Sequence, residues 1–112
     1  MIREIILKDL PKLSLNKIYA GIHWTQRTKD KNTYKMIVKS QFKEVLSKDF
    51  SYKVSYEFNF KRNALDTSNT VYMLKMIEDI IFEDDTYKII PELNIKSQKA
   101  KEDFIKITIE QL

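Results

Sequence analysis

The regular alternation of large apolar and polar residues from position 50 to position 61 constrains the fold of this chain more than any other feature. Its apolar positions are Tyr52, Val54, Tyr56, Phe58 and Phe60. A period of two places these side chains on one face of a β-strand. Because that face is broad and aromatic, we expect it to pack against helices.

The rest of the chain predicts three more strands and two helices. The strands are expected at residues 2–8, 87–96 and 104–110, and the helices at 32–47 and 68–82. Pro91 implies that its strand lies at an edge of the sheet or contains a bulge. The polar stretch 9–31 has no clear period, and we expect it to be irregular. The order β-α-β-α-β-β predicts one α/β (α+β) sandwich domain over residues 1–112, with a mixed four-stranded sheet carrying two helices.

Both predicted helices have a buried and an exposed face. The buried face of the first is expected to hold Tyr34, Ile37, Val38, Phe42, Val45 and Leu46, with Asn32 or Thr33 as its N-cap. Lysines recur every four residues on its outside, at positions 31, 35, 39 and 43. This row of lysines is expected either to bind a row of phosphates or, more commonly, to be an ordinary solvated face of the helix.

The second helix separates two faces when its residues are placed at 100° steps. Its apolar arc holds Met73, Leu74, Met76, Ile77, Ile80 and Ile81. Its polar stripe holds Ser68, Tyr72, Lys75 and Asp79. The acids Glu83, Asp84 and Asp85 follow at the helix C-terminus, where negative charge is unfavourable. We therefore expect a metal ion or a nearby cation to compensate them.

Composition excludes several classes of protein. The chain has no cysteine, so disulfides, thiolate metal sites and cysteine nucleophiles are excluded. Its single glycine excludes glycine-rich phosphate-binding loops. The N-terminus is too charged for a signal peptide and no apolar run approaches a membrane span, so we expect a cytoplasmic protein without membrane contact.

Charge is distributed unevenly along the chain. Residues 1–62 carry fourteen Lys and Arg against six Asp and Glu, whereas residues 63–112 carry six against ten. A basic first half suits a polyanion and an acidic second half suits a metal ion. The alternative is an ordinary solvated surface of a lysine-rich protein.

The stretch 9–31 interleaves aromatic residues and cations. Tyr19 and Trp24 precede Arg27, Lys29 and Lys31. This pattern is typical of contacts to nucleic-acid backbone and bases. The alternative is that Tyr19 and Trp24 cover one end of the core.

Three fragments together resemble the RusA-type Holliday junction resolvases, which are small metal-dependent endonucleases of bacteria and their phages. The stretch from Pro11 to Tyr19, which contains the fragment LSLNKIY with Asn16, is similar to an N-terminal Pro-x-x-x-Asn-x-x-Tyr region, with one extra residue between Pro11 and Asn16. The family core has Asp-x-Asp-Asn, then a Lys six residues after the Asn and an Asp four residues further on. The fragment LDTSNTVYMLKMIEDI resembles this core, since Asp66, Asn69, Lys75 and Asp79 have that spacing. The fragment FEDDTYKI looks like the Asp-Asp turn that closes the family's site. Ser68 stands where the family pattern has a second aspartate, and the segment before Asp84 is shorter than usual.

The resemblance implies a Mg²⁺-dependent endonuclease, with Mn²⁺ as a possible substitute, that cuts Holliday junctions in recombination or repair as a phage-type homodimer. The implied catalytic residues are Asp66, Lys75 and Asp85, the metal ligands are Asp66, Asp79, Asp84 and Asp85, and Ser68 and Asn69 are supporting residues. The expected DNA-binding residues are Asn16, Tyr19, Arg27, Lys29, Lys31, Lys35, Lys61 and Arg62.

Two alternatives to this activity are open. The first is a catalytically decayed dimer that acts as a DNA- or protein-binding regulator or inhibitor. In the second, Asp66 or Ser68 only caps a helix, and Lys75 and Asp79 form a surface ion pair.

Overall fold

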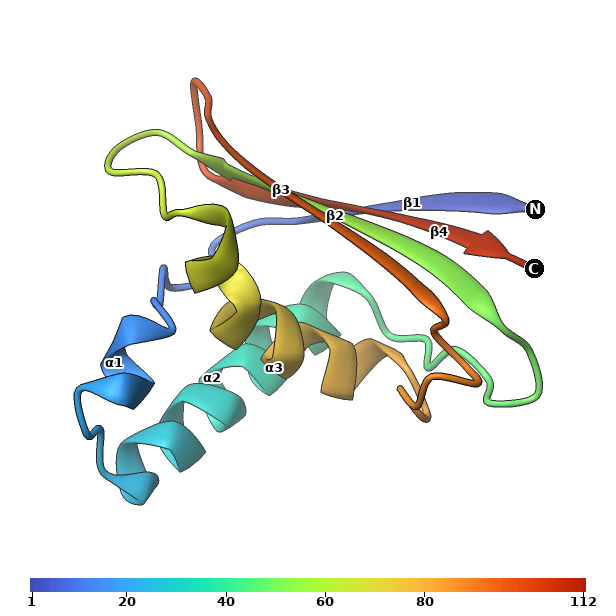
Figure 1. Ribbon diagram of the computed structural model, residues 1–112, viewed down its shortest axis with the longest axis horizontal. Coiled ribbons are helices and arrows are strands. Elements are labelled where there is room, and N and C mark those ends of the chain that lie inside the picture. Colours follow the sequence, from blue (N-terminus) through green and yellow to red (C-terminus); the bar gives the residue numbers. More distant parts are fainter.

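Four strands and three α-helices make up the fold in the computed structural model, which describes residues 1–112 (Figure 1). In chain order the elements are β1 (Ile2–Leu7), α1 (Asn16–Tyr19), α2 (Trp24–Gln41), β2 (Tyr52–Phe60), the 3-10 turn η1 (Thr67–Thr70), α3 (Val71–Ile81), β3 (Glu92–Lys99) and β4 (Phe104–Gln111). The predicted mixed four-stranded sheet is confirmed. The short helix α1 is an addition to the two helices that the sequence predicted.

The strands are ordered β1-β4-β2-β3, so β2 and β4 are central. β4 pairs antiparallel with both β1 and β2, whereas β3 pairs parallel with β2. A parallel pair needs a long crossover, and here η1 and α3 supply it. All helices lie on one face of the sheet, and the other face is open (Figure 1).

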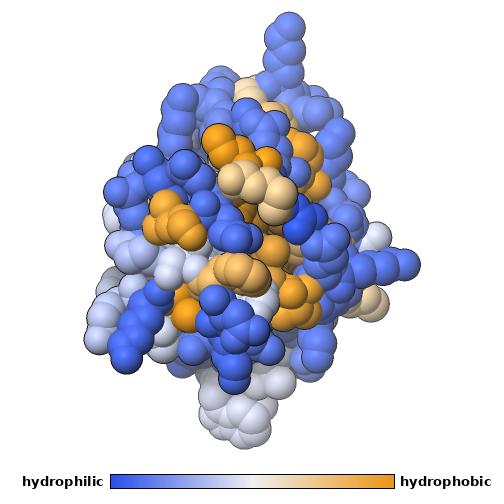
Figure 2. Space-filling model, turned by 90° about the vertical axis from the view of Figure 1, so that its right-hand side faces the viewer, coloured by the Kyte–Doolittle hydropathy of each residue, from blue (hydrophilic) through white to orange (hydrophobic).

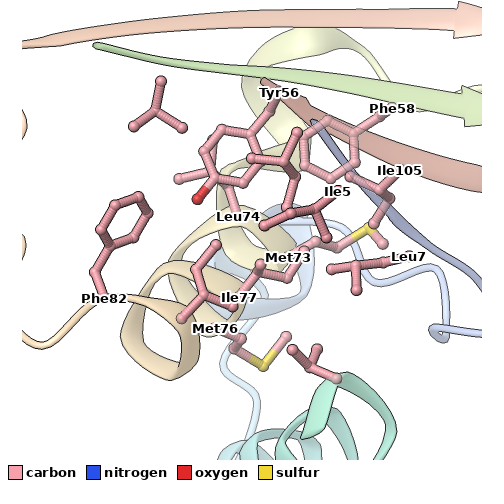
Figure 3. Packing of buried hydrophobic residues seen from close by; sticks show 14 of the residues in the cluster. Ile5, Leu7, Tyr56, Phe58, Met73, Leu74, Met76, Ile77, Phe82 and Ile105 are labelled. Carbon is pink, nitrogen blue, oxygen red and sulfur yellow. The ribbon is translucent and has the colours of Figure 1, made fainter. Parts of the chain in front are cut away.

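The predicted inward face of β2 is confirmed, since its five alternating apolar residues are all buried. Figure 3 shows Met73, Leu74 and Ile77 of α3 lying close to Tyr56 and Phe58 of β2. Both sets belong to one core of 20 buried apolar residues. Full burial of such a side chain contributes about 2 kcal/mol, so this contact fixes α3 on the sheet.

The first predicted helix has the wrong bounds. α2 begins at Trp24, well before the expected N-cap, and His23 caps it by accepting a hydrogen bond from the Thr25 N–H. Its early turns show no apolar period because the only residue they bury is Asp30. The expectation of an irregular stretch over residues 9–31 is therefore wrong for α1 and for the start of α2.

The chain leaves α2 at Phe42, whose backbone is extended. The following segment runs beside the end of α3, with hydrogen bonds from Leu46 N to Ile81 O at 2.8 Å and from Glu83 N to Leu46 O at 2.9 Å. Val45, expected in the core, is 52% exposed. It joins other exposed apolar side chains at the end of the molecule that holds both termini, where apolar patches lie among hydrophilic side chains (Figure 2).

β3 starts five residues later than predicted, directly after Pro91, and it is an edge strand as that proline implied. Proline lacks the N–H that a central strand donates, which explains this position. No helix combines the length and the apolar character that a membrane crossing needs.

Candidate functional site

A cleft of about 280 Å³ lies between α1, α2 and α3. Its charged lining residues are Arg27 and Lys31 of α2 with Lys75 and Asp79 of α3. It shares Lys31, Met76 and Asp79 with a second hollow of about 440 Å³, which Lys35 and Lys39 extend along α2. We call these two connected hollows the helix groove. The structure thus brings predicted DNA-binding residues beside two predicted site residues.

The basic side of the helix groove follows from the period of α2. Arg27, Lys31, Lys35 and Lys39 recur at intervals of four residues and therefore share one face of the helix. No carboxylate forms an ion pair with any of them. Their charges remain available to a polyanion.

A buried hydrogen bond holds α2 against α3 beneath the cleft. The Tyr72 hydroxyl donates to Asp30 Oδ2 at 2.7 Å, and Gln26 Nε2 donates to Asp30 Oδ1 at 3.0 Å. Burial, together with the Asp30 carboxylate, raises the pKa of Tyr72 to about 12. The expectation that Tyr72 lies on the exposed polar stripe is therefore wrong, because its hydroxyl serves an internal carboxylate.

Lys75 binds two carboxylates at once. Its Nζ lies 2.6 Å from Asp85 Oδ2 and 2.9 Å from Glu78 Oε1. The surface ion pair of Lys75 with Asp79, which was the alternative to a catalytic site, is absent, and Asp79 instead lines the helix groove. We call Lys75, Glu78 and Asp85 the ion cluster.

Burial and charge act differently on the three members of the ion cluster. Burial raises the pKa of Glu78 to about 7, although Lys75 partly opposes the shift. The hydrogen bond from Lys75 lowers the pKa of Asp85 below its ordinary value. Burial disfavours the charged form of Lys75, but hydrogen bonds to Asp85 and Glu78 raise its pKa overall. Asp85 is therefore the carboxylate that stays ionised most readily.

Glu78 is the site residue that the sequence analysis missed. It is buried on the inner side of α3, where the Tyr56 hydroxyl is also buried and has no hydrogen-bond partner. Burial, and then the nearby Glu78 charge, raises the pKa of Tyr56. The available signal was the spacing of three between Lys75 and Glu78, which places them on neighbouring turns.

The acids after α3 are compensated locally. Asp84 Oδ1 accepts hydrogen bonds from the backbone N–H groups of Asp85 at 2.8 Å and Thr86 at 3.3 Å. Glu83 Oε1 accepts one from Lys48 N at 3.0 Å. For Asp85, the expected nearby cation is Lys75.

The first half of the predicted acidic site lies elsewhere. Asp66 precedes η1 and forms no side-chain cap, while Asn69 accepts a backbone hydrogen bond from Leu15 N at 3.0 Å. Because Asp85 folds back onto Lys75, the helical run that separates Asp66 from this pair covers η1 and only the first half of α3, roughly 15 Å. Ser68 lies within η1 and has no side-chain hydrogen bond. Asp66 forms no ion pair with Lys75 and is not a member of the ion cluster.

The remaining predicted DNA-binding residues border other surfaces. Asn16 and Tyr19 are exposed on α1, and Lys29 lies on the side of α2 away from the helix groove. Lys61 and Arg62 follow β2, where Lys61 N donates to Asp103 Oδ1 at 2.7 Å and Lys12 Nζ donates to Arg62 O at 3.0 Å. Neither residue lines the helix groove.

The ion cluster brings only two carboxylates together, fewer than the acidic site that the sequence predicted. No three His, Asp or Glu side chains gather closely enough to enclose a metal ion. Mg²⁺ often takes only one or two carboxylates and completes its shell with water and substrate phosphates. Asp85 and Glu78, with Asp84 one residue away, supply that number of oxygen ligands.

No family model matches the chain, and no curated protein matches it.

Proposed function

We propose that this protein is a Mg²⁺-dependent, structure-specific endonuclease of the RusA-like kind that binds branched DNA along the helix groove. The single observation that carries the proposal is the position of Lys75. Its side chain lines the groove beside Arg27 and Lys31 and also contacts the carboxylates of Asp85 and Glu78. A phosphate lying on the cations of α2 is therefore adjacent to a possible metal site.

Binding follows from the unpaired cations of α2. A double-stranded DNA presents one negative charge per about 1.7 Å of its axis, and each cation that meets a phosphate releases bound counterions. The row from Arg27 to Lys39 advances about 6 Å at each step of four residues, as helix geometry requires. Such a row contacts several phosphates and makes affinity strongly dependent on salt.

Cutting in this proposal uses the ion cluster. Asp85 and Glu78, with support from Asp84, would hold the metal, which when bound supplies charge neutralisation at the phosphate and an activated water. Lys75 donates to the phosphate oxygens and stabilises the charge that develops there. Asp66 joins such a site only across a homodimer interface, which two cuts on opposing strands also require. The proposal includes a cytoplasmic location and a role in DNA recombination or repair.

The test is cleavage of a labelled four-way junction with Mg²⁺ in the reaction. Asp85→Asn is expected to abolish cleavage while leaving junction binding equal or tighter, because it removes a negative charge near phosphate. Asp49→Asn, at an exposed carboxylate after α2, is the matched control and should cut at the wild-type rate. Wild-type cleavage that persists unchanged in Asp85→Asn would show that the assignment of Asp85 is wrong.

A second candidate is a DNA-binding regulator that has lost cleavage. Two observations favour it. Lys75 is engaged by two carboxylates, and Ser68, where an aspartate is expected, forms no side-chain hydrogen bond. In that case the wild type binds junctions in a salt-dependent manner but cuts none at any Mg²⁺ or Mn²⁺ concentration. A titration of both metals on the wild type separates the two candidates, since metal-dependent cleavage of the junction at any concentration excludes the regulator that has lost cleavage.

A further inference from the structure

We propose that Trp24 and Tyr19 form a stacking surface for unpaired DNA bases at the α1 end of the helix groove. This inference rests on the proposed DNA binding and specifies which part of the DNA the protein contacts there. The region lies at the end of the molecule away from both termini, where α1 meets the start of α2 (Figure 1).

Both rings are free of the core. Trp24 is 68% exposed and Tyr19 is 80% exposed. Neither belongs to the core cluster or to the partly buried apolar residues packed against it, although Ile18, the residue before Tyr19, does. The alternative that these aromatics cover one end of the core is therefore wrong. Two exposed rings close together in sequence offer flat apolar surface to a ligand.

The backbone holds Trp24 at a defined place. Gly21, with φ of +89°, makes the turn between α1 and α2 in a conformation that other residues rarely adopt. His23 then caps α2, and its ring lies 5.6 Å from the Trp24 ring, centroid to centroid, at an interplanar angle of 31°. Trp24 is thus the first residue of a capped helix and not part of a loose loop.

The helix period places Trp24 on the cationic side of α2. At 100° per residue, its direction lies within about 60° of Arg27, Lys31 and Lys35. A strand whose phosphates follow these cations has its bases within reach of the aromatic end. This combination of a cationic track with aromatic rings is the usual way in which proteins bind single-stranded nucleic acid. Arg27, three residues after Trp24, adds a planar cation on the same side.

The test uses the only tryptophan of the chain as its own probe. Intrinsic fluorescence is titrated with an oligothymidine and with a fully paired duplex of equal length, while the anisotropy of labelled DNA reports binding independently. We expect oligothymidine to quench the fluorescence and the duplex to quench it much less. By anisotropy, Trp24→Ala should bind oligothymidine about tenfold more weakly and the duplex less than about threefold more weakly, given the stacking contribution of one base.

Two variants act as controls. Trp24→Phe keeps an aromatic ring and should recover most of the affinity for oligothymidine. Tyr87→Ala removes a ring that is 77% exposed but lies in the turn after α3, and it should bind like wild type. Circular dichroism of each variant checks that α2 is intact.

The outcomes separate this inference from the proposed function. If the wild type binds junction and duplex DNA but Trp24→Ala loses no affinity for oligothymidine, the stacking surface is refuted and DNA binding stands. If Trp24→Ala weakens oligothymidine and duplex equally, or no more than Tyr87→Ala does, the inference also fails. Absence of any DNA binding by the wild type overturns both proposals.

Discussion

The helix groove and the ion cluster hold charge in opposite ways. Arg27, Lys31 and Lys35 face the groove without ion-pair partners, whereas the charges of the ion cluster satisfy one another. Lys75 belongs to both regions. The comparison teaches that the groove is ready for a polyanion, while the ion cluster must exchange an internal contact before Lys75 can serve a ligand.

Removing the shared residue should have the largest effect. Lys75→Ala is expected to lower the rate of junction cleavage about 100-fold, the usual loss when one charge-stabilising donor is removed. It also leaves the buried Glu78 without its cation. Single-turnover cleavage with saturating protein measures the rate, and Lys88→Ala, at an exposed lysine outside both regions, is the control. An unchanged rate would mean that Lys75 serves only the ion cluster.

The next effect concerns pH and the buried acid of the ion cluster. The pKa of Glu78 is raised from 4.5 to about 7 by burial, so the folded state binds this proton more tightly than the unfolded state does. Stability should therefore fall by about 1–3 kcal/mol as the pH rises from 4.5 through 7. Asp85, whose pKa is lowered, contributes in the opposite sense, and its stabilisation is lost only when the pH falls below its ordinary range.

Glu78→Gln tests this prediction, because glutamine does not titrate. Urea unfolding at pH 5 and at pH 8 should show the loss in wild type and little or none in Glu78→Gln. Glu102→Gln, at an exposed glutamate, should behave like wild type. An equal loss in Glu78→Gln would assign the pH dependence to another group.

A smaller effect is expected when cations are removed from the helix groove, where they have no ion-pair partners. The double variant Lys31→Ala, Lys35→Ala should bind DNA about tenfold more weakly and reduce the slope of log affinity against log salt by about 2. Fluorescence anisotropy over a salt series measures both quantities. Lys29→Ala lies on the other side of α2 and should change neither. If Lys29→Ala weakens binding as much as one groove lysine does, the DNA does not follow the groove.

The smallest effect concerns the one acid in the helix groove. Asp79→Asn should tighten DNA binding about twofold, because it removes a screened repulsion with phosphate. The ion cluster should be unaffected, since Asp79 forms no ion pair with Lys75. Unfolding by urea at pH 7 checks this, and a clear loss of stability would show that Asp79 has a structural role.

The fold was largely predictable where apolar periods are strong. The alternation in β2 and the apolar arc of α3 fixed the central strand and the crossover helix close to their observed bounds. The start of α2 was missed because its early turns bury only Asp30, a residue that no apolar pattern includes. A helix held by a buried carboxylate and the Tyr72 hydroxyl has no signature in hydropathy.

The candidate site was predictable only in part. Helical spacing correctly placed Lys75 near acidic residues, but it suggested Asp79 as the partner. The chain reverses after α3 and brings Asp85 back to Lys75, and a contact across ten positions cannot be read from a helical period. The same spacing argument did not show that η1 and α3 hold Asp66 far from that contact.

The strand order has a consequence for the way in which the chain is made. β1 pairs only with β4, and β2 pairs only with β3 and β4, so neither of the first two strands has a neighbour until the last quarter of the chain exists. Pairing Ile2 with Glu110 closes a loop of almost the whole sequence, which slows folding. During synthesis, the aromatic face of β2 can therefore pack against α3 before its neighbouring strands exist. The nascent chain depends on that helix to shield this face from association with other chains.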